Sequence, residues 1–428
     1  DEDMTHWPLQ PNWQPFQVDG SHEHIVLDHN RCILCRRCVR ACSELVGNFT
    51  WGMSERGPLT MLAADLDVPY GESTCVSCGT CVQVCPTGAL IDRQSAYRGR
   101  EADVKRIKST CIGCSVGCGV ELIVRDNQLL WIDGDWEAPV NEGVLCEVGR
   151  FRSLQDERER VVTPLVRKNG ALKAATWEEA LNFLAEKLKP LAGKNGDRVA
   201  ALVSTRLPNE ALHLFKQLFA DKFGSEAVTS IEEGVTVALP AQMAQEIGKP
   251  FEGDLAALKA ADCVVAFGVD LVANHQVAGF FVKRGLPNGT KLIVVDPFDN
   301  GLHELADYAL RPEKGTDRDL LLGIMSAVVD LGAVKDELSN LPDLTQHTPE
   351  MVSQTTGVPA EAIRDVARVL AIAQKPAFVY GKGVTGQDSM QVLEFLVELA
   401  RLVGAWDGSR SAIIGTKGQA NSTAAALY

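Results

Sequence analysis

Residues 75–90 of this 428-residue chain read CVSCGTCVQVCPTGAL, with four cysteines before Pro86 in the spacing C-x2-C-x2-C-x3-C. An earlier run, from Cys32 to Cys42, has the same spacing. A [4Fe–4S] cluster takes one thiolate per iron, and in two-cluster proteins the fourth cysteine of each run binds the other cluster. The repeated spacing therefore predicts two [4Fe–4S] clusters in the N-terminal part of the chain.

The crossed pattern assigns the ligands of both clusters. It predicts cluster 1 on Cys32, Cys35, Cys38 and Cys85, and cluster 2 on Cys75, Cys78, Cys81 and Cys42. Zinc is an alternative because C-x2-C pairs also bind zinc, but complete four-cysteine runs in tandem favour iron and sulfur. A disulfide framework suits short secreted chains and fits these repeats less well.

A third cysteine group has a different spacing, C-x2-C-x3-C-x27-C, at Cys111, Cys114, Cys118 and Cys146. It predicts a third [4Fe–4S] cluster in a separate small domain. Twelve of the 13 cysteines are then ligands. The thirteenth, Cys263, begins a predicted strand and is expected to be a buried core thiol.

Composition limits the function classes. The formal net charge of −14 argues against nucleic-acid binding, which needs a basic surface. A hydrophobic content of 46% indicates a globular chain of two or three domains. No run of about eighteen uncharged apolar residues occurs, so we expect no membrane span in this chain. The start does not resemble an export signal, and we expect a cytoplasmic protein that is membrane-associated only through partner subunits.

The chain divides into four expected segments. Residues 1–29 are predicted to be an extended arm in which His6, His22, His24 and His29 lie at the surface. Residues 30–104 are predicted to form an α+β, ferredoxin-like two-cluster domain, and residues 105–160 a small β-rich single-cluster domain. The remaining residues, 161–428, are predicted to form an α/β domain. In the last segment short apolar runs alternate with helical patterns, which predicts a parallel sheet covered on both faces. The predicted strands are Val199–Val203, Cys263–Gly268, Leu292–Asp296 and Ala377–Gly381, and the predicted helices are Trp177–Leu188, Glu210–Phe223, Asp319–Leu331, Ala360–Ala373 and Met390–Val403.

The segment Gly381–Gly386 matches G-x-G-x-x-G after a predicted strand and before a predicted helix. This is the context of a dinucleotide site, with Glu398 at a possible ribose-binding distance. A single match of this kind is weak support. A structural glycine loop is the favoured interpretation.

The chain resembles the iron–sulfur/molybdopterin oxidoreductase superfamily over residues 22 to 428. The superfamily includes NAD-linked formate dehydrogenases, the large iron–sulfur subunit of respiratory complex I and subunits of NAD-linked hydrogenases. Besides the cysteine runs, the resemblance rests on Asp262-Cys263, on Lys291–Pro297 (KLIVVDP), on Gly315-Thr316-Asp317 and on Gly418-Gln419-Ala420-Asn421. It implies molybdopterin-type α/β domains after the clusters, with Gly315, Thr316, Asp317, Gly418, Gln419 and Asn421 marking the pterin region.

The sequence departs from the catalytic members of this superfamily. No cysteine metal ligand occurs in the stretch 228–240, where Thr229, Ser230 and Thr236 are the remaining oxygen candidates and nothing distinguishes them. The lysine that usually stands two residues after the last cluster cysteine is replaced by Val148. Asp-Pro-Arg of the family becomes Asp296-Pro297-Phe298, and the chain ends at Tyr428, where catalytic members continue. These departures favour a vestigial pterin domain with no molybdopterin and no catalytic residues in this chain.

The resemblance and its departures together predict an electron-transfer subunit of a multi-subunit NAD(P)-linked oxidoreductase of hydrogenase or complex I type. Conversion of hydride to single electrons needs a flavin. We therefore expect a flavoprotein partner that handles NAD(P)H, and a second, catalytic partner subunit such as a hydrogenase. The alternative is a catalytic molybdenum or tungsten bis-pterin subunit of a formate dehydrogenase.

Overall fold

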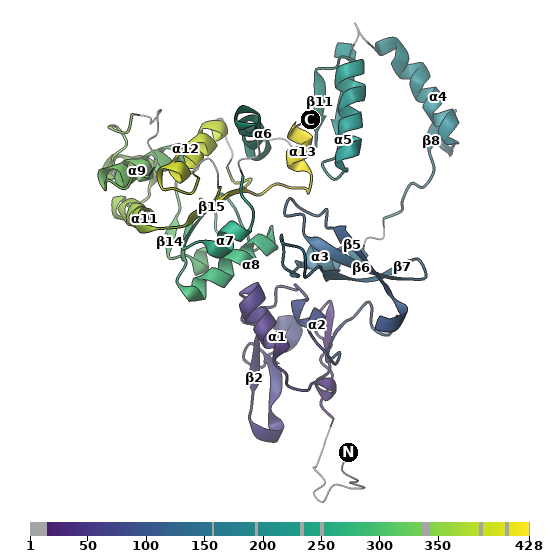
Figure 1. Cartoon of the computed structure of the whole chain (residues 1–428), viewed down its shortest axis with the longest axis horizontal. Coiled ribbons are helices and arrows are strands. Elements are labelled where there is room, and N and C mark those ends of the chain that lie inside the picture. The colour runs from purple at the N-terminus through teal and green to yellow at the C-terminus, as the bar shows by residue number, and fades with distance from the viewer. Residues whose placement is uncertain are drawn as a thin grey trace, which may run out of the picture. The chain divides into compact units, whose positions relative to one another are not determined.

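The computed structural model describes residues 15–155, 158–192, 196–231, 235–248, 252–335, 343–384, 388–406 and 411–427. It forms two compact units (Figure 1). The first unit holds the chain up to Lys108 together with Glu121–Asp135 and Gly143–Leu154. The second unit holds Ser109–Val120, Trp136–Glu142 and the chain from Gln155 onward.

The first unit is built from short elements around the two cysteine runs. Two antiparallel pairs, β1 (Ile25–Leu27) with β4 (Leu90–Asp92) and β2 (Trp51–Ser54) with β3 (Met61–Ala64), flank two four-residue helices, α1 (Arg37–Arg40) and α2 (Thr80–Gln83). A π-helical turn at Ala41–Val46 follows α1 and carries Cys42. Ile25, Trp51 and Tyr70 are among the buried residues of this core. The expected α+β, ferredoxin-like organisation is confirmed.

A β-rich segment follows, as the sequence predicts. It contains β5 (Lys105–Thr110), β6 (Gly119–Arg125) and β7 (Gln128–Gly134), paired in the order β5-β6-β7, and the short helix α3 (Glu147–Arg150). The tight connection between β6 and β7 is Asp126-Asn127, and both residues have positive φ, at 51° and 61°. Two left-handed residues match the twist of a hairpin, and Asp and Asn tolerate that conformation.

The second unit centres on a five-stranded parallel sheet in the order β14-β13-β12-β15-β16. Its strands are β12 (Cys263–Phe267), β13 (Lys291–Val295), β14 (Tyr308–Leu310), β15 (Pro376–Tyr380) and β16 (Ile413–Gly415). Every residue of β12 and β15 is buried, so both faces of the sheet are covered. This confirms the α/β expectation, and the unbroken apolar run of β12 explains why the sequence predicts that strand correctly.

The described part of the second unit also contains ten α-helices. Figure 1 shows α9, α11 and α12 grouped together, apart from α7 and α8. The core joins α9, α11 and α12 to the Cys263, Val265 and Phe267 face of β12. The helices are α4 (Trp177–Leu188), α5 (Asn209–Lys216), α6 (Val235–Ile247), α7 (Ala256–Ala260), α8 (Gln276–Gly285), α9 (Asp317–Asp330), α10 (Pro349–Thr356), α11 (Ala360–Ile372), α12 (Ser389–Leu402) and α13 (Ser422–Leu427).

Two features depart from the sequence-based picture. The strand expected at Val199–Val203 is present as β10 (Ala200–Val203), but it pairs only with β11 (Ala227–Ser230) in a separate two-stranded parallel sheet. A hairpin of β8 (Leu165–Lys168) and β9 (Ala171–Ala174) precedes α4 and has no counterpart in the prediction. None of the described helices is long and apolar enough to cross a bilayer.

The prediction of surface histidines is wrong for His22 and His24. Both are buried in the first unit, at 5% and 2% exposure. The His22 ring stacks on Tyr70 at 4.4 Å, and the His24 ring stacks on Phe151 at 4.6 Å. Their aromatic partners lie far along the chain, so local composition could not reveal the burial. His6 lies outside the described residues.

Candidate iron–sulfur sites

The two cysteine runs fold into the same backbone shape. In each run the residue before the second cysteine and the residue after it are left-handed: Leu34 and Arg36 in the first run, Ser77 and Gly79 in the second, with φ between 53° and 65°. In each run the N–H of that first left-handed residue also points to the sulfur of the first cysteine at 3.4 Å. This shape turns three side chains inward and directs amide groups at sulfur, as a cluster loop requires.

The predicted ligands of cluster 1 surround one cavity. Cys32, Cys35 and Cys38 line it together with Cys85, which comes from the other run, and with apolar side chains such as Met53 and Leu62. Burial, opposed by a backbone hydrogen bond and reinforced by the neighbouring thiols, raises the pKa of Cys38 to about 12. Four thiols that line one apolar cavity would not ionise there unaided. They suit an iron-containing group that binds thiolates and neutralises their negative charge. The donor set therefore fits a [4Fe–4S] cluster.

The predicted ligands of cluster 2 also lie close together, inside the core of the first unit. Burial raises the pKa of Cys75 to about 11, and Cys78 and Cys42 add to that rise. Burial also raises the pKa of Cys42, and the neighbouring Cys78 adds to that rise. Cys81 has the same neighbours, and its pKa is raised well above the ordinary value. Cys42 is therefore an electrostatic neighbour of the second run, and the crossed ligand set itself stays a prediction.

Tyr70 is a site residue that sequence reasoning missed. It is 1% exposed, and its hydroxyl lies 3.3 Å from Sγ of Cys75 and 3.8 Å from Sγ of Cys81. Burial, together with these cysteines, raises the pKa of Tyr70 well above its ordinary value. Either atom of each contact could be the donor. If the cysteines bind a cluster as thiolates, the phenol is the partner that carries the proton, and Tyr70 would donate to the sulfurs of the second ligand set.

The third ligand set is divided between the two units. Cys111, Cys114 and Cys118 lie in the second unit, and Cys146 lies in the first. Within the second unit, the amide of Cys111 donates to the carbonyl of Cys118 at 2.8 Å, which closes the loop. The buried side chain of Asn141 fixes the residue after Cys118, since it bonds both the N–H and the C=O of Gly119. The four-cysteine set itself stays a prediction.

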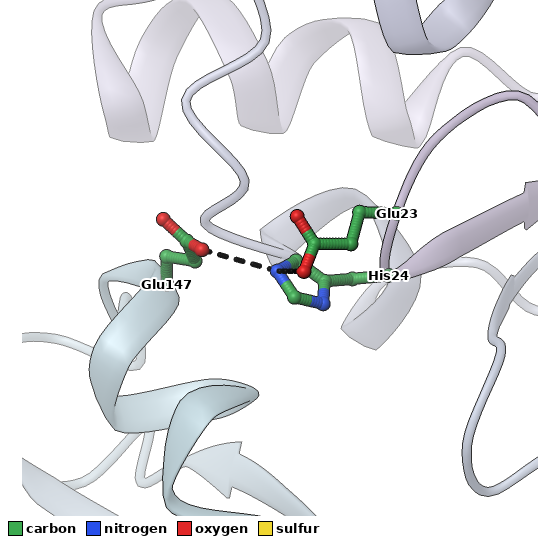
Figure 2. A group of neighbouring side chains, drawn as sticks. All are labelled: Glu23, His24 and Glu147. Atoms are coloured by element: carbon green, nitrogen blue, oxygen red, sulfur yellow. Dashed lines mark hydrogen bonds and ion pairs between the residues drawn. The ribbon is translucent and has the colours of Figure 1, made fainter. Parts of the chain in front are cut away.

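Among the described residues, one further group of potential metal ligands lies within the first unit. Figure 2 shows the His24 ring with the carboxylates of Glu147 and Glu23 turned toward the same ring nitrogen, at 3.1 Å and 4.0 Å. Arg152 donates to the same Glu147 oxygen at 2.9 Å, and Glu23 is largely exposed. Arg152 already neutralises Glu147, so the group is an ion-pair cluster that links the β1 region to α3. It is therefore a poor binding site for a metal cation.

The cavity beside the third cysteine loop tests the fit of a pterin cofactor. It measures about 280 Å³, and its lining includes Ser115, Val116, Glu252, Asp254 and Lys417. Lys417 is the only cation among its described lining residues, and both oxygens of Glu252 lie 2.7 Å from its ammonium group. The Tyr380 hydroxyl donates to Glu252 as well, at 2.6 Å. A neutralised lysine beside two carboxylates does not fit the phosphates of a pterin cofactor.

The residues that mark the pterin region are engaged within the protein. Gln419 accepts a hydrogen bond from Arg206 at 2.7 Å, and Asn421 donates to the Leu207 carbonyl at 2.7 Å. Gly418 lies in the same turn, beside Lys417. Gly315, Thr316 and Asp317 lie at the start of α9 and are absent from the described lining of the cavity. Burial raises the pKa of Asp317, and the nearby Asp296 adds to that rise.

Two further sequence-based interpretations have structural counterparts. Cys263 is 1% exposed in β12, and burial raises its pKa to about 12, so the core-thiol prediction is confirmed. The glycine loop after β15 packs against the chain itself, because the amide of Gly383 donates to the Gly268 carbonyl at 2.8 Å. A Cβ on Gly383 would lie 2.5 Å from that oxygen, so the glycine has a packing role. Residues 385–387, which include the end of the motif, lie outside the described residues.

Comparisons with known proteins cover nearly the whole chain. The molybdopterin oxidoreductase family matches residues 160–426, the molybdopterin oxidoreductase Fe4S4 domain matches 104–153, and two 4Fe-4S dicluster domains match 31–89 and 68–120. An NADH-quinone oxidoreductase subunit of Rhizobium meliloti is 30% identical over 79% of this chain and 38% of that protein. A formate dehydrogenase-like protein of Staphylococcus haemolyticus is 26% identical over 84% of this chain and 42% of that protein.

Solved structures share the fold. Acetylene hydratase from Pelobacter acetylenicus superimposes with a TM-score of 0.56 at 20% identity, over 71% of this chain and 44% of that chain. This likeness concerns the fold alone. The chain spans about two fifths of the length of the two curated relatives from Rhizobium and Staphylococcus.

Proposed function

Because the chain belongs to the molybdopterin oxidoreductase family, we propose that it relays single electrons through three [4Fe–4S] clusters within a multi-subunit NAD(P)-linked oxidoreductase. Its relationship to an NADH-quinone oxidoreductase subunit supports a complex I-like role in electron transfer. The observation that carries the proposal is the cavity shared by Cys32, Cys35, Cys38 and the distant Cys85. A bound cluster supplies reversible one-electron chemistry there.

The cysteines of this chain would bind the clusters, and the residues around them would set the reduction potentials of the clusters. The ligand sets we propose are Cys32, Cys35, Cys38 and Cys85 for cluster 1; Cys75, Cys78, Cys81 and Cys42 for cluster 2; and Cys111, Cys114, Cys118 and Cys146 for cluster 3. The second set has buried surroundings, and its sulfurs, once bound to a cluster, would accept a hydrogen bond from Tyr70. Burial and hydrogen bonding are the main means by which a protein sets cluster potentials.

The loop of cluster 1 offers a surface for an electron-transfer partner. Cys35 is exposed, as are Ile33 at 63% and Leu34 at 40%. The exposed side chains of Arg36 and Arg37 lie beside them and add positive charge to the same loop. Small apolar surfaces with a charged rim suit weak redox encounters. We propose that this surface docks a partner with an acidic surface, for which the flavoprotein that handles NAD(P)H is the candidate.

The charge of the cavity beside the third cysteine loop favours a chain without its own pterin. Its lysine, Lys417, is neutralised by Glu252, and Asp254 adds a further negative charge. No step is therefore assigned to molybdenum or tungsten in this chain. The rival function is a catalytic subunit like the formate dehydrogenase-like relatives, and it requires a stoichiometric metal–pterin.

The proposal is tested by a potentiometric titration of the anaerobically purified chain, followed by electron paramagnetic resonance. We expect three separate one-electron centres, and each should disappear in a cysteine-to-serine variant of its own set. A chain that shows no reducible centre after iron–sulfur reconstitution would contradict the proposal. Zinc in stoichiometric amounts at the two cysteine runs would do the same.

A further inference from the structure

A buried arginine joins the second cysteine run to the segment that carries Cys146. Arg150 is 3% exposed, and its guanidinium donates to the Cys78 carbonyl at 2.7 Å and to the Gln83 side chain at 2.6 Å. It also donates to the Ile132 carbonyl at 3.1 Å and to Asp133 at 3.2 Å. Four acceptors on two neighbouring segments fix the planar group in one orientation.

The backbone of Arg150 completes the connection. Its amide donates to the Cys146 carbonyl at 3.1 Å within the first turn of α3, so a short hydrogen-bonded path runs from one predicted ligand to another. The second run is shaped to admit this side chain. A Cβ on Gly79 would lie 2.2 Å from Cδ of Arg150, and Gly79 has a φ of +65°. Glycine therefore serves both the loop conformation and the close approach of the arginine.

The charge of Arg150 lies directly against the Cys78 loop. Its guanidinium donates to the Cys78 carbonyl at 2.7 Å, and its one carboxylate partner among the described residues is Asp133, at 3.2 Å. Asp133 also pairs with Arg106, which has Glu101 and Glu121 as two further carboxylate partners. Loss of the Arg150 cation therefore removes positive charge next to the Cys78 loop and leaves the Asp133 carboxylate behind. A buried cation next to a centre that gains an electron stabilises the reduced form, because screening by water is weak there.

We propose that Arg150 is a positioning residue for electron transfer: it holds the Cys78 loop against the Cys146 segment and raises the reduction potential of the second cluster. The resemblance to catalytic members places Val148 at the position where they usually carry a lysine. In this chain the buried cation of that segment is Arg150, and it is directed to the second cysteine run. This inference rests on the proposed electron-transfer function. It gives the hydrogen-bonded connection from Cys78 through Arg150 to Cys146 a role in the relay.

The test is a redox titration of the full-length chain, with dithionite as the electron donor, on the unmodified protein and on Arg150→Met and Arg150→Lys. The signal of the second cluster is the one lost in Cys75→Ser. Arg125→Met is the matched control, since Arg125 is an exposed arginine of the same unit that pairs with the exposed Asp126. Iron content and melting temperature are measured on each variant.

We expect Arg150→Met to disfavour reduction of the second cluster about tenfold, which is a shift of about 59 mV to lower potential for a one-electron couple. Arg150→Lys should keep most of the potential because the charge remains, and Arg125→Met should change nothing. An Arg150→Met chain with full iron and an unchanged potential overturns the inference and leaves Arg150 a structural residue. A shift of equal size in Arg125→Met overturns it as well.

If Arg150→Met does not fold with its iron, Arg150→Lys decides the question. Lysine keeps the charge but loses the fork of donors. The inference is supported if Arg150→Lys keeps its full iron and its equilibrium constant for reduction of the second cluster lies within a few-fold of that of the unmodified chain. A tenfold decrease in that equilibrium constant contradicts the inference. The proposed function fails separately, since in that case the unmodified chain itself has no reducible clusters.

Discussion

Removing the hydroxyl of Tyr70 should lower the reduction potential of the second cluster and leave the fold intact. The hydroxyl lies 3.3 Å from Sγ of Cys75, and the ring packs against His22 at 4.4 Å and Trp51 at 4.5 Å. Tyr70→Phe keeps both ring contacts and removes the donor. Hydrogen bonds to charged groups contribute about 1.5–3 kcal/mol. Only the part that strengthens when the cluster gains an electron affects the potential, and we take it as about 1 kcal/mol.

A tenfold change in equilibrium is about 1.4 kcal/mol and about 59 mV for a one-electron couple, so about 1 kcal/mol corresponds to a decrease of about 40 mV. The assay is a potentiometric titration followed by electron paramagnetic resonance at fixed pH. Tyr97→Phe is the control, since Tyr97 is an exposed tyrosine of the same unit whose hydroxyl accepts from Arg31. An unchanged potential in Tyr70→Phe, with all iron retained, would refute the assigned hydrogen bond.

Two further predictions concern the ligands and the docking surface. Cys85→Ser should lose the signal of cluster 1 and about four iron atoms per chain. The control Cys263→Ser should keep every cluster and change only the stability of the fold. Equal iron loss in both variants would argue against the crossed ligand set. The double variant Arg36→Glu with Arg37→Glu should slow electron exchange with the flavoprotein partner at low salt by about tenfold or more, and the difference should shrink as ionic strength rises. A rate that does not change with salt or charge would place the docking surface elsewhere.

Much of the fold follows from the sequence where one signal dominates. The prediction of α4 at Trp177–Leu188 matches the helix end to end, because its apolar periodicity is clear and Thr176 accepts a hydrogen bond from the Glu179 amide as its N-cap. The helix α6 is missed because Pro240 lies inside it and argues against a helix. The short edge strand β14 contains only Tyr308–Leu310, which is too few residues to show a period.

Some features of the candidate cluster sites are also predictable from the sequence, and others are not. Cysteine spacing gives the ligand types and predicts that Cys42 lies with the second run, because the spacing of a cluster loop is itself a geometric constraint. Neither Tyr70 nor Arg150 is predictable from the sequence. Tyr70 lies only five positions before Cys75, but no sequence pattern indicates that its hydroxyl turns toward that sulfur. Arg150 reaches Cys78 from 72 positions along the chain. A glycine at position 79, inside the second cysteine run, is the one local sign of that approach.

The metals that the chain holds distinguish an electron relay from a catalytic subunit. The decisive measurement is elemental analysis of the anaerobically purified chain, with pterin released by acid oxidation and quantified in the same sample. An electron relay of three clusters predicts about twelve iron atoms per chain, with molybdenum, tungsten and pterin far below stoichiometric amounts. Molybdenum or tungsten at one atom per chain with bound pterin would contradict it and would show that this chain carries a catalytic site.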